Sequence, residues 1–112
     1  MHEFSLVKKE VEKALGKVAG KKVSRVKFLL GRMAHGNPQS IREAFKIAAA
    51  GTALSGAELE VVVVEPKVKC GGCGKVFNVD KEINLSCPHC NSKSNELVSG
   101  EECYIENIEI ED

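Results

Sequence analysis

Apolar residues in the first eighteen positions recur with the spacing of a helix. From Glu3 to Val18 the apolar positions fall near one face, while lysine and glutamate fall largely on the other; the apolar set is Leu6, Val7, Val11, Ala14, Leu15 and Val18. This pattern predicts an amphipathic helix that ends before Gly20.

A second helical pattern follows Asn37. Asparagine is a favoured N-cap residue, and proline at position 38 suits the first position of a helix. The apolar residues that follow are spaced at three and four positions, namely Ile41, Ala44, Phe45 and Ala48. We therefore expect a helix that runs from Pro38 to a stop at Gly51.

Three segments read as strands. The first covers Val23 to Leu30, with Val26, Phe28 and Leu30 on one face. The second covers 57–65 and ends at Pro66. The third covers 102–111, where strict alternation places one set of side chains on one face (Tyr104, Glu106, Ile108, Ile110) and the other set on the opposite face (Ile105, Asn107, Glu109, Glu111).

The order of these elements predicts an α+β fold. Two helices cover one side of a small three-stranded sheet, and a zinc-ribbon-like module is inserted between two strands of that sheet. We expect residues 1–66 and 100–112 to form the larger α/β domain, and residues 67–99 to form the inserted module.

Four cysteines form the most specific pattern in the chain. They make two C-x2-C pairs, with thirteen residues between the pairs: Cys70, Cys73, Cys87 and Cys90. Two such pairs complete the tetrahedral S4 set of a structural zinc site. Two disulfides are the alternative, and they need an oxidising compartment. The chain shows no apolar signal run after Met1, so the pattern favours zinc in a reduced, cytoplasmic setting.

A site with four cysteine ligands has no open position for a substrate. The chain also has no histidine paired with a nucleophile and no glycine-rich phosphate loop, which argues against an enzyme. No apolar run reaches the length of a membrane span.

Charge is balanced over the chain but not along it. Sixteen basic and sixteen acidic residues give a net charge of zero, which argues against a general nucleic-acid binder. Residues 1–35 are mainly basic, and residues 96–112 carry acids and no base. We expect these two segments to pack side by side, so that much of the contrast cancels.

The amino terminus offers a second possible metal site. The α-amine of Met1, the amide nitrogen of His2 and its imidazole Nδ1 can close two chelate rings around one ion. Three nitrogens in a plane suit Ni(II) or Cu(II). A histidine at this position is more often simply exposed, so this motif alone does not identify a nickel site.

Several motifs together resemble one family. The MHEFSL opening, the segment Gly51–Val61, the segment Pro38–Thr52 and the two C-x2-C pairs before a short final strand are similar to the HypA/HybF family of hydrogenase nickel-incorporation proteins. The resemblance covers essentially the whole chain. It implies a nickel metallochaperone, with Met1, His2 and Glu3 as the nickel motif and the four cysteines as structural zinc ligands.

The same resemblance implies partners. These are a HypB-type GTPase, the large subunit of [NiFe]-hydrogenase and, in some bacteria, urease accessory proteins. A monomer or a homodimer is compatible with it. The alternative function is a zinc-ribbon module for nucleic-acid or protein interaction, because residues 67–100 carry five lysines against three acids.

Some residues outside these motifs also stand out in the sequence. The chain reads Gly31-Arg32-Met33 where many members of the family read G-E-L, which reverses a charge. His35 and His89 are most simply exposed residues, although either could bind a metal. Cys103 is expected to be a buried or half-buried residue at the start of the last strand.

Overall fold

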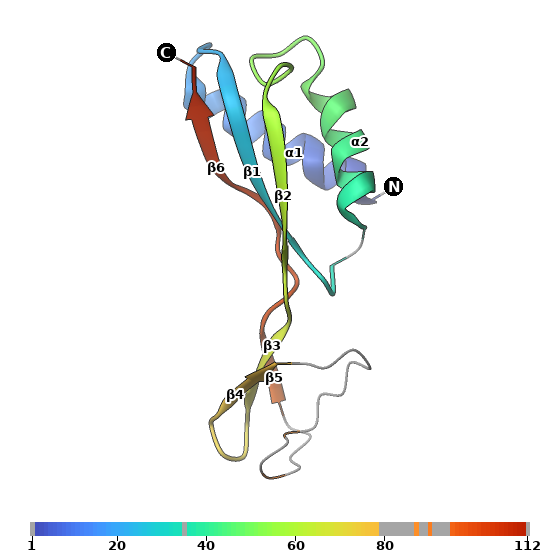
Figure 1. Ribbon diagram of the computed structural model, residues 1–112, viewed down its shortest axis with the longest axis vertical. Coiled ribbons are helices and arrows are strands. Elements are labelled where there is room, and N and C mark those ends of the chain that lie inside the picture. Colours follow the sequence, from blue (N-terminus) through green and yellow to red (C-terminus); the bar gives the residue numbers. More distant parts are fainter. Residues whose placement is uncertain (1, 35, 79–86, 88–89, 91–94, 112) are drawn as a thin grey trace.

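The computed structural model describes residues 2–34, 36–78, 87, 90 and 95–111. Figure 1 shows the order of its elements, which are α1 (His2–Val18), β1 (Val23–Gly31), α2 (Pro38–Ala49), β2 (Glu58–Val64), β3 (Lys67–Cys70), β4 (Val76–Asn78), β5 (Asn95–Ser99) and β6 (Cys103–Ile110). All five predicted helices and strands are present, with ends within two residues of those predicted. No helix in the described part of the chain is long and apolar enough to span a membrane.

The strands form two separate three-stranded sheets. The first has the order β2-β1-β6, with β1 parallel to β2 and antiparallel to β6. Both helices cover one face of this sheet (Figure 1), as the sequence predicts. The second sheet, β4-β3-β5, is antiparallel and lies between β2 and β6 in the chain. The α+β fold with an inserted small module is therefore confirmed.

The start of α2 is capped as its sequence predicts. The backbone N–H of Ser40 donates to Oδ1 of Asn37 at 2.9 Å, and the backbone N–H of Asn37 donates to Oγ of Ser40 at 3.0 Å. These two bonds satisfy amides that have no partner inside a helix. Pro38 then occupies the first turn.

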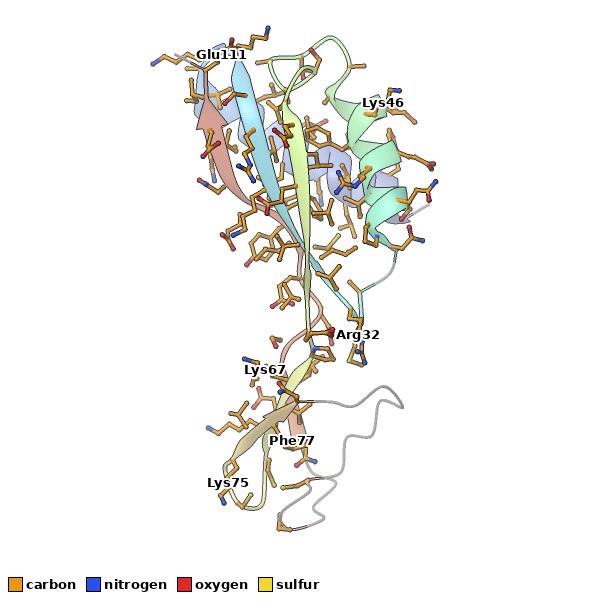
Figure 2. The ribbon with its side chains drawn as sticks, viewed as in Figure 1. Arg32, Lys46, Lys67, Lys75, Phe77 and Glu111 are labelled. Carbon is orange, nitrogen blue, oxygen red and sulfur yellow. The ribbon has the colours of Figure 1, made fainter. Side chains whose placement is uncertain are left out.

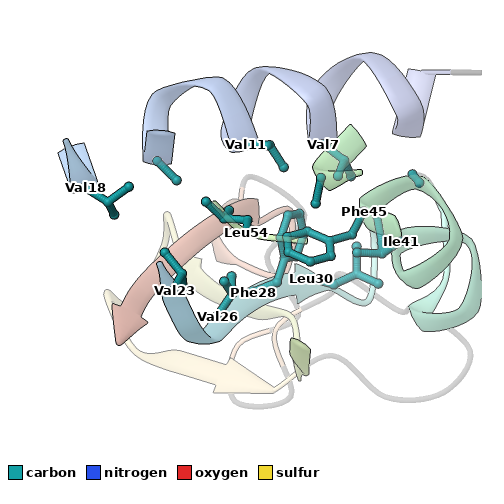
Figure 3. Packing of buried hydrophobic residues seen from close by; sticks show 13 residues of the cluster. Val7, Val11, Val18, Val23, Val26, Phe28, Leu30, Ile41, Phe45 and Leu54 are labelled. Atoms are coloured by element: carbon teal, nitrogen blue, oxygen red, sulfur yellow. The ribbon is translucent and has the colours of Figure 1, made fainter. Parts of the chain in front are cut away.

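The hydrophobic core lies between the helices and the first sheet (Figure 3). Val26, Phe28 and Leu30 of β1 are at most 2% exposed, which confirms the predicted inward face of that strand. Val23 of β1 is fully buried as well, and both helices and the loop after α2 contribute further buried members, among them Val7, Val11, Ile41 and Leu54. None of the strands β3, β4 or β5 contributes to this cluster.

The strict alternation predicted for the last strand is wrong. In β6, Ile105 lies opposite Phe28 and Asn107 lies opposite Lys27, so Glu106 is an extra residue at a bulge. Because of this extra residue, the side chains of β6 after Glu106 point to the face opposite to the one that strict alternation predicts. As a result Ile105 and Ile108, which strict alternation puts on opposite faces, both pack against the core.

The basic and acidic ends of the chain lie together, as predicted. Strand β6 lies beside β1 and also contacts α1. Lys27 pairs with Glu106 at 3.5 Å, and Lys22 pairs with Glu111 at 3.9 Å. These two ion pairs cancel part of the contrast in charge along the sequence.

Two segments of the chain, which we call the crossings, join the two sheets: residues 65–66 lead from β2 to β3, and residues 100–102 lead from β5 to β6. They form a narrow waist (Figure 1) in a molecule that measures 52 × 26 × 17 Å. The loop after β1 binds both crossings: Arg32 N–H donates to the Val64 carbonyl at 2.9 Å, and Met33 N–H donates to the Gly100 carbonyl at 2.8 Å. The guanidinium of Arg32, labelled in Figure 2, also pairs with Glu65 at 3.3 Å. The division into domains at residues 66 and 100 stays a prediction.

Candidate metal centre

The four cysteines of the two C-x2-C pairs converge at one point. Cys70 ends β3 and Cys73 lies in the turn after it, while Cys87 and Cys90 come from the segment between β4 and β5. All four Sγ atoms lie within 4.8 Å of one another. The sequence prediction that these residues form one cluster agrees with this geometry.

The sulfur distances fit a metal site and not disulfides. Sγ of Cys70 lies 3.4 Å from Sγ of Cys90, and Sγ of Cys73 lies 3.7 Å from Sγ of Cys87. A disulfide requires about 2.05 Å. A tetrahedral zinc site with Zn–S bonds of about 2.3 Å has S···S edges of about 3.8 Å. Both of these distances also join one cysteine of each pair, as one shared ion would require.

The turn after β3 directs backbone amides at one sulfur. Gly72 N–H and Cys73 N–H each donate to Sγ of Cys70 at 3.3 Å. The turn is closed by Cys70 N–H donating to the Lys75 carbonyl at 2.8 Å, and Gly74 adopts a φ of +75° that a side chain would strain. The glycines of this turn therefore have a direct role in shaping the cluster.

These bonds change the acidity of Cys70. The N–H of Cys73 makes the largest contribution to lowering the pKa of the Cys70 thiol from 9.0 to about 6; burial opposes the shift, and Cys90 and the N–H of Gly72 add to it. Donors aimed at a sulfur favour the thiolate, which is the form that binds metal. Cys70 is therefore prepared as a ligand by its own backbone surroundings.

Burial differs between the members of each pair. Cys70 and Cys87 are buried, whereas Cys73 and Cys90 are exposed. The donor set of four thiols in this arrangement fits a closed zinc site, with no position left for a substrate.

Asn95 supports the cluster and was missed by the sequence reading. It lies opposite Cys70 in the β3–β5 pair, and its Oδ1 accepts a hydrogen bond from Gly71 N–H at 3.2 Å. It thereby ties the first cysteine turn to β5. Strand β5 is short and begins with a polar residue, so its alternation gives no strong signal in the sequence.

The predicted nickel motif lies at the start of α1. Helix α1 begins at His2, and Phe4 packs against the core. Met1 lies outside the described residues, as do the side chains of His2 and Glu3. Their assignment as nickel ligands stays a prediction. The amino-terminal end of α1 lies beside the first half of α2 (Figure 1).

Of the other residues singled out in the sequence, Cys103 is half-buried against the core cluster, as predicted. His35 and His89 lie outside the described residues. Arg32, the reversed charge after β1, lies at the waist and pairs with Glu65.

Comparisons with known proteins agree over nearly the whole chain. A family model described as "Hydrogenase/urease nickel incorporation, metallochaperone, hypA" matches residues 1–110. A hydrogenase maturation factor HypA from Chlorobium limicola is 39% identical, covering 100% of this chain and 98% of that protein. The protein of the same name from Nostoc punctiforme is 35% identical, covering 100% and 97%.

Solved structures agree on the fold. A solution structure of the Ni metallochaperone HypA from Helicobacter pylori matches with a TM-score of 0.72, at 22% identity, over 96% of each chain. A second solution structure, of a HypA protein, matches with a TM-score of 0.74, at 23% identity, over 99% of this chain and 97% of that one. The chain therefore belongs to the HypA family of hydrogenase/urease nickel-incorporation metallochaperones.

Proposed function

We propose that this chain binds Ni(II) at its amino terminus and delivers it for the maturation of [NiFe]-hydrogenase. The observation that carries the proposal is the family match over residues 1–110, which includes Met1-His2-Glu3. The proposed role is that of a carrier, in which metal ligands exchange and no covalent bond of a substrate is changed.

The proposed nickel ligands are the α-amine of Met1, the amide nitrogen and imidazole Nδ1 of His2, and Glu3. Three nitrogens in one plane suit the tetragonal geometry that Ni(II) favours. Glu3 completes the motif through its amide or its carboxylate. The α-amine must be free, because acetylation or removal of Met1 would destroy the first chelate ring.

The position of this motif at a helix start supports the proposal. The first four N–H groups of a helix have no carbonyl partner inside it, so His2 can lose its amide proton without breaking a helical hydrogen bond. The partial positive charge of the helix start opposes a bound cation. The deprotonated amide and the Glu3 carboxylate offset this effect, and the resulting modest affinity suits an ion that must be passed on.

The four cysteines are proposed to hold zinc, which would keep β3, β4 and β5 together as a structural site. This role requires reduced thiols, and we therefore propose a cytoplasmic location. The family resemblance suggests a HypB-type GTPase and the [NiFe]-hydrogenase large subunit as partners, and urease accessory proteins where a urease is present.

A nickel titration of the zinc-loaded protein with an authentic, untagged terminus tests this function. We expect one equivalent of Ni(II) to bind the native chain and none to bind the His2→Ala variant. His35→Ala and His89→Ala are the matched controls, because these are the remaining histidines of the chain. Both should retain nickel binding, and all variants should retain zinc.

Nickel binding by His2→Ala equal to that of the native chain would reject the amino-terminal site. If His35→Ala or His89→Ala lost nickel binding while His2→Ala kept it, the nickel site would instead be assigned to the segment around His35 or to the module that contains His89. Acetylation of the α-amine gives an independent check, since it removes one ligand while leaving every side chain in place.

A further inference from the structure

Strand β2 is an edge of the first sheet, and two hydrogen bonds show which of its backbone groups point outward. On the side of β1, the N–H of the residue after β1 donates to the Val64 carbonyl at 2.9 Å. On the other side, the guanidinium of Arg42 in α2 donates to the Leu59 carbonyl at 2.8 Å. Backbone groups of successive residues alternate between the two sides of a strand. Val61 and Val63 therefore direct their N–H and C=O groups away from β1.

These outward groups have no partner in the part of the chain that the structure describes. The hydrogen bonds formed there outside the regular pairing include none to the backbone of Val61 or Val63. The segment Val61–Val64 is uncharged and β-branched throughout, and it pairs with β1 in unbroken register. Val63 is 43% exposed. We call the outward side of Val61–Val63 the valine edge; it lacks the charges, prolines and bulges that usually protect an edge strand.

The opposite edge of the same sheet is protected. There the Glu10 carboxylate of α1 accepts the hydrogen bond of Ile105 N–H at 3.0 Å. The bulge at Glu106 interrupts the regular ladder of β6, and Glu109 adds a further exposed charge. The open valine edge is therefore a particular feature of β2 and not a general property of this small sheet.

A positive group stands at one end of the valine edge. Arg42 is exposed, and among the described residues its guanidinium contacts the Leu59 carbonyl and no carboxylate. By contrast, Arg25 on the same sheet pairs with Glu60 at 2.8 Å. A guanidinium has five N–H donors, so Arg42 can hold this carbonyl and still bind an acid. Its charge favours an occupant with a carboxylate at the Leu59 end of the edge.

We propose that the valine edge accepts an extended segment of a partner protein as a fourth strand, with a carboxylate that pairs with Arg42. In an antiparallel arrangement, the two partner residues opposite Val61 and Val63 would exchange backbone hydrogen bonds with them. Their side chains would lie on the helix side, where Val61 packs against the core, so apolar side chains fit there. The proposal does not depend on the nickel motif.

A second copy of this chain fits the valine edge less well. Pairing across a twofold axis would bring the two copies of α2 to the same face, because α2 contacts β2. Paired strands lie about 4.8 Å apart, whereas packed helices need about 8–10 Å between their axes. The acid that such pairing centred on Val62 would place opposite Leu59 is Glu65, which already pairs with Arg32 at 3.3 Å.

Hydrogen exchange of the zinc-loaded, full-length chain, followed by nuclear magnetic resonance, tests the proposal. The probe is the peptide acetyl-Thr-Val-Thr-Val-Thr-Asp-amide. In the free chain we expect the amides of Val61 and Val63 to exchange faster than those of Val62 and Val64, which face β1. Saturating peptide should slow the exchange of Val61 and Val63 and leave the other two unchanged.

Methylated peptides separate strand addition from contact between side chains alone. A peptide with N-methyl groups on both valines cannot donate to the edge, and it should bind about tenfold or more weakly. A peptide methylated on the middle threonine, whose N–H would point away from β2, should bind almost as the parent peptide does. These peptides keep every side chain and need no change in the protein.

Variants of the chain locate the site. Val63→Lys places a charge at the valine edge and should weaken peptide binding by about tenfold or more. Ile110→Lys is the matched control, because Ile110 is also 43% exposed, lies in β6 and gives the same change in charge. It should bind the peptide as the native chain does.

The role of Arg42 has its own comparison. Arg42→Gln should weaken binding of the peptide that ends in Asp, and it should leave unchanged the binding of a peptide with Asn in its place. Equal weakening for both peptides would remove the carboxylate from the proposal.

Four outcomes would overturn the site. These are no binding of the parent peptide, equal binding of the two methylated peptides, equal effects of Val63→Lys and Ile110→Lys, and slow exchange of Val61 and Val63 in the dilute free chain. Protection of these two amides that rises with protein concentration, without peptide, would replace the proposal with self-association.

Discussion

Gly31 and Gly100 are in direct backbone contact at the waist of the molecule. A Cβ atom on Gly31 would overlap the carbonyl group of Gly100, and Gly31 N–H donates to the Glu102 carbonyl at 2.6 Å. Gly100 adopts a φ of +110°, and a Cβ there would lie 2.7 Å from Cα of Pro66. Side chains at these two positions would therefore force the crossings apart.

Alanine at either of these glycines should destabilise the protein. We expect Gly31→Ala to lower the free energy of unfolding by about 2 kcal/mol or more, because backbone is displaced. Gly100→Ala should lower it by about 1–3 kcal/mol, from both contact and the positive φ. Urea denaturation of the zinc-loaded protein measures both changes.

Gly16 provides the matched control. It lies in α1, and a Cβ there would meet nothing within 4 Å. Gly16→Ala should raise the free energy of unfolding by about 0.5–1 kcal/mol, since alanine is the better helix former. A loss of stability in Gly16→Ala as large as in Gly31→Ala would show that close packing at the waist is not the cause.

The Glu10 carboxylate protects the outer edge of the first sheet. Its Oε1 accepts a hydrogen bond from Ile105 N–H of β6 at 3.0 Å, and its Oε2 lies 3.3 Å from Nζ of Lys13. The Glu10 side chain is 15% exposed. We expect Glu10→Ala to destabilise the protein by about 1–3 kcal/mol, because the Ile105 amide loses a charged acceptor.

Glu12→Ala is the control for this prediction, since Glu12 is exposed on the same helix. It should change stability by about 0.5 kcal/mol or less. Hydrogen exchange gives a second measurement: the Ile105 amide should exchange faster in Glu10→Ala alone. Unchanged protection of that amide would contradict the role assigned to Glu10.

Removal of the metal should affect the two sheets differently. Among the described residues of the second sheet and its cysteine loops, the fully buried side chains are Val68, Cys70 and Cys87. Two of these three side chains belong to the cysteine cluster, so we expect the module to depend on its metal for stability. With a strong chelator we expect resonances of β3, β4 and β5 to collapse to unfolded positions, while those of α1, α2 and β1 persist.

Readdition of zinc should restore the lost resonances in the native chain. It should not restore them in Cys70→Ser, and it should restore them in Cys103→Ser, because Cys103 packs against the core of the first sheet. Simultaneous loss of both sheets on chelation would show that the larger part depends directly on the metal.

The lowered pKa of Cys70 predicts how zinc affinity varies with pH. The pKa of Cys70 in the folded protein, about 6, lies below the ordinary 9.0. The Cys70 thiolate therefore contributes fully to the free energy of folding above pH 9, and this contribution is lost as the pH falls through 6. Above pH 6 the proton of Cys70 does not compete with zinc in the folded protein. Below it, this residue should add up to about a tenfold loss of affinity per pH unit.

Competition with a chelator of known affinity, repeated from pH 5 to pH 8, measures this dependence. The slope of log zinc affinity against pH should be greater by about one below pH 6 than above it, because zinc then displaces one more proton. Cys103→Ser should show the same steepening, because that residue is not in the cluster. A slope that stays constant across pH 6 would show that Cys70 does not titrate there.

Much of the first sheet and its helices could be predicted from the sequence because each element has a strong local signal. Asn37-Pro38 fixed the start of α2, and the alternation about Phe28 identified the inward face of β1. The cysteine cluster was predictable for a similar reason, since two residues between paired cysteines let both sulfurs reach one ion.

The parts that sequence reading missed depend on contacts between distant segments. The bulge at Glu106 reflects how β6 meets β1, and alternation within β6 gives no sign of it. The contact between Gly31 and Gly100 joins the last residue of β1 to the residue after β5, which are far apart in the chain. Arg32 stood out only as a reversed charge, and its pairing with Glu65 depends on the path of the crossing.

The insertion of the second sheet between β2 and β6 also governs how the protein can fold. Strand β6 must pair with β1, but the whole module lies between β2 and β6 in the chain. The entropy cost of closing a loop rises with its length, by about 0.6 kcal/mol for each doubling. A metal that joins Cys70 to Cys90 shortens this loop, so zinc loading should accelerate the pairing of β6 with β1. The folding rate of the larger sheet, which has no metal ligand of its own, would then depend on the supply of zinc during synthesis.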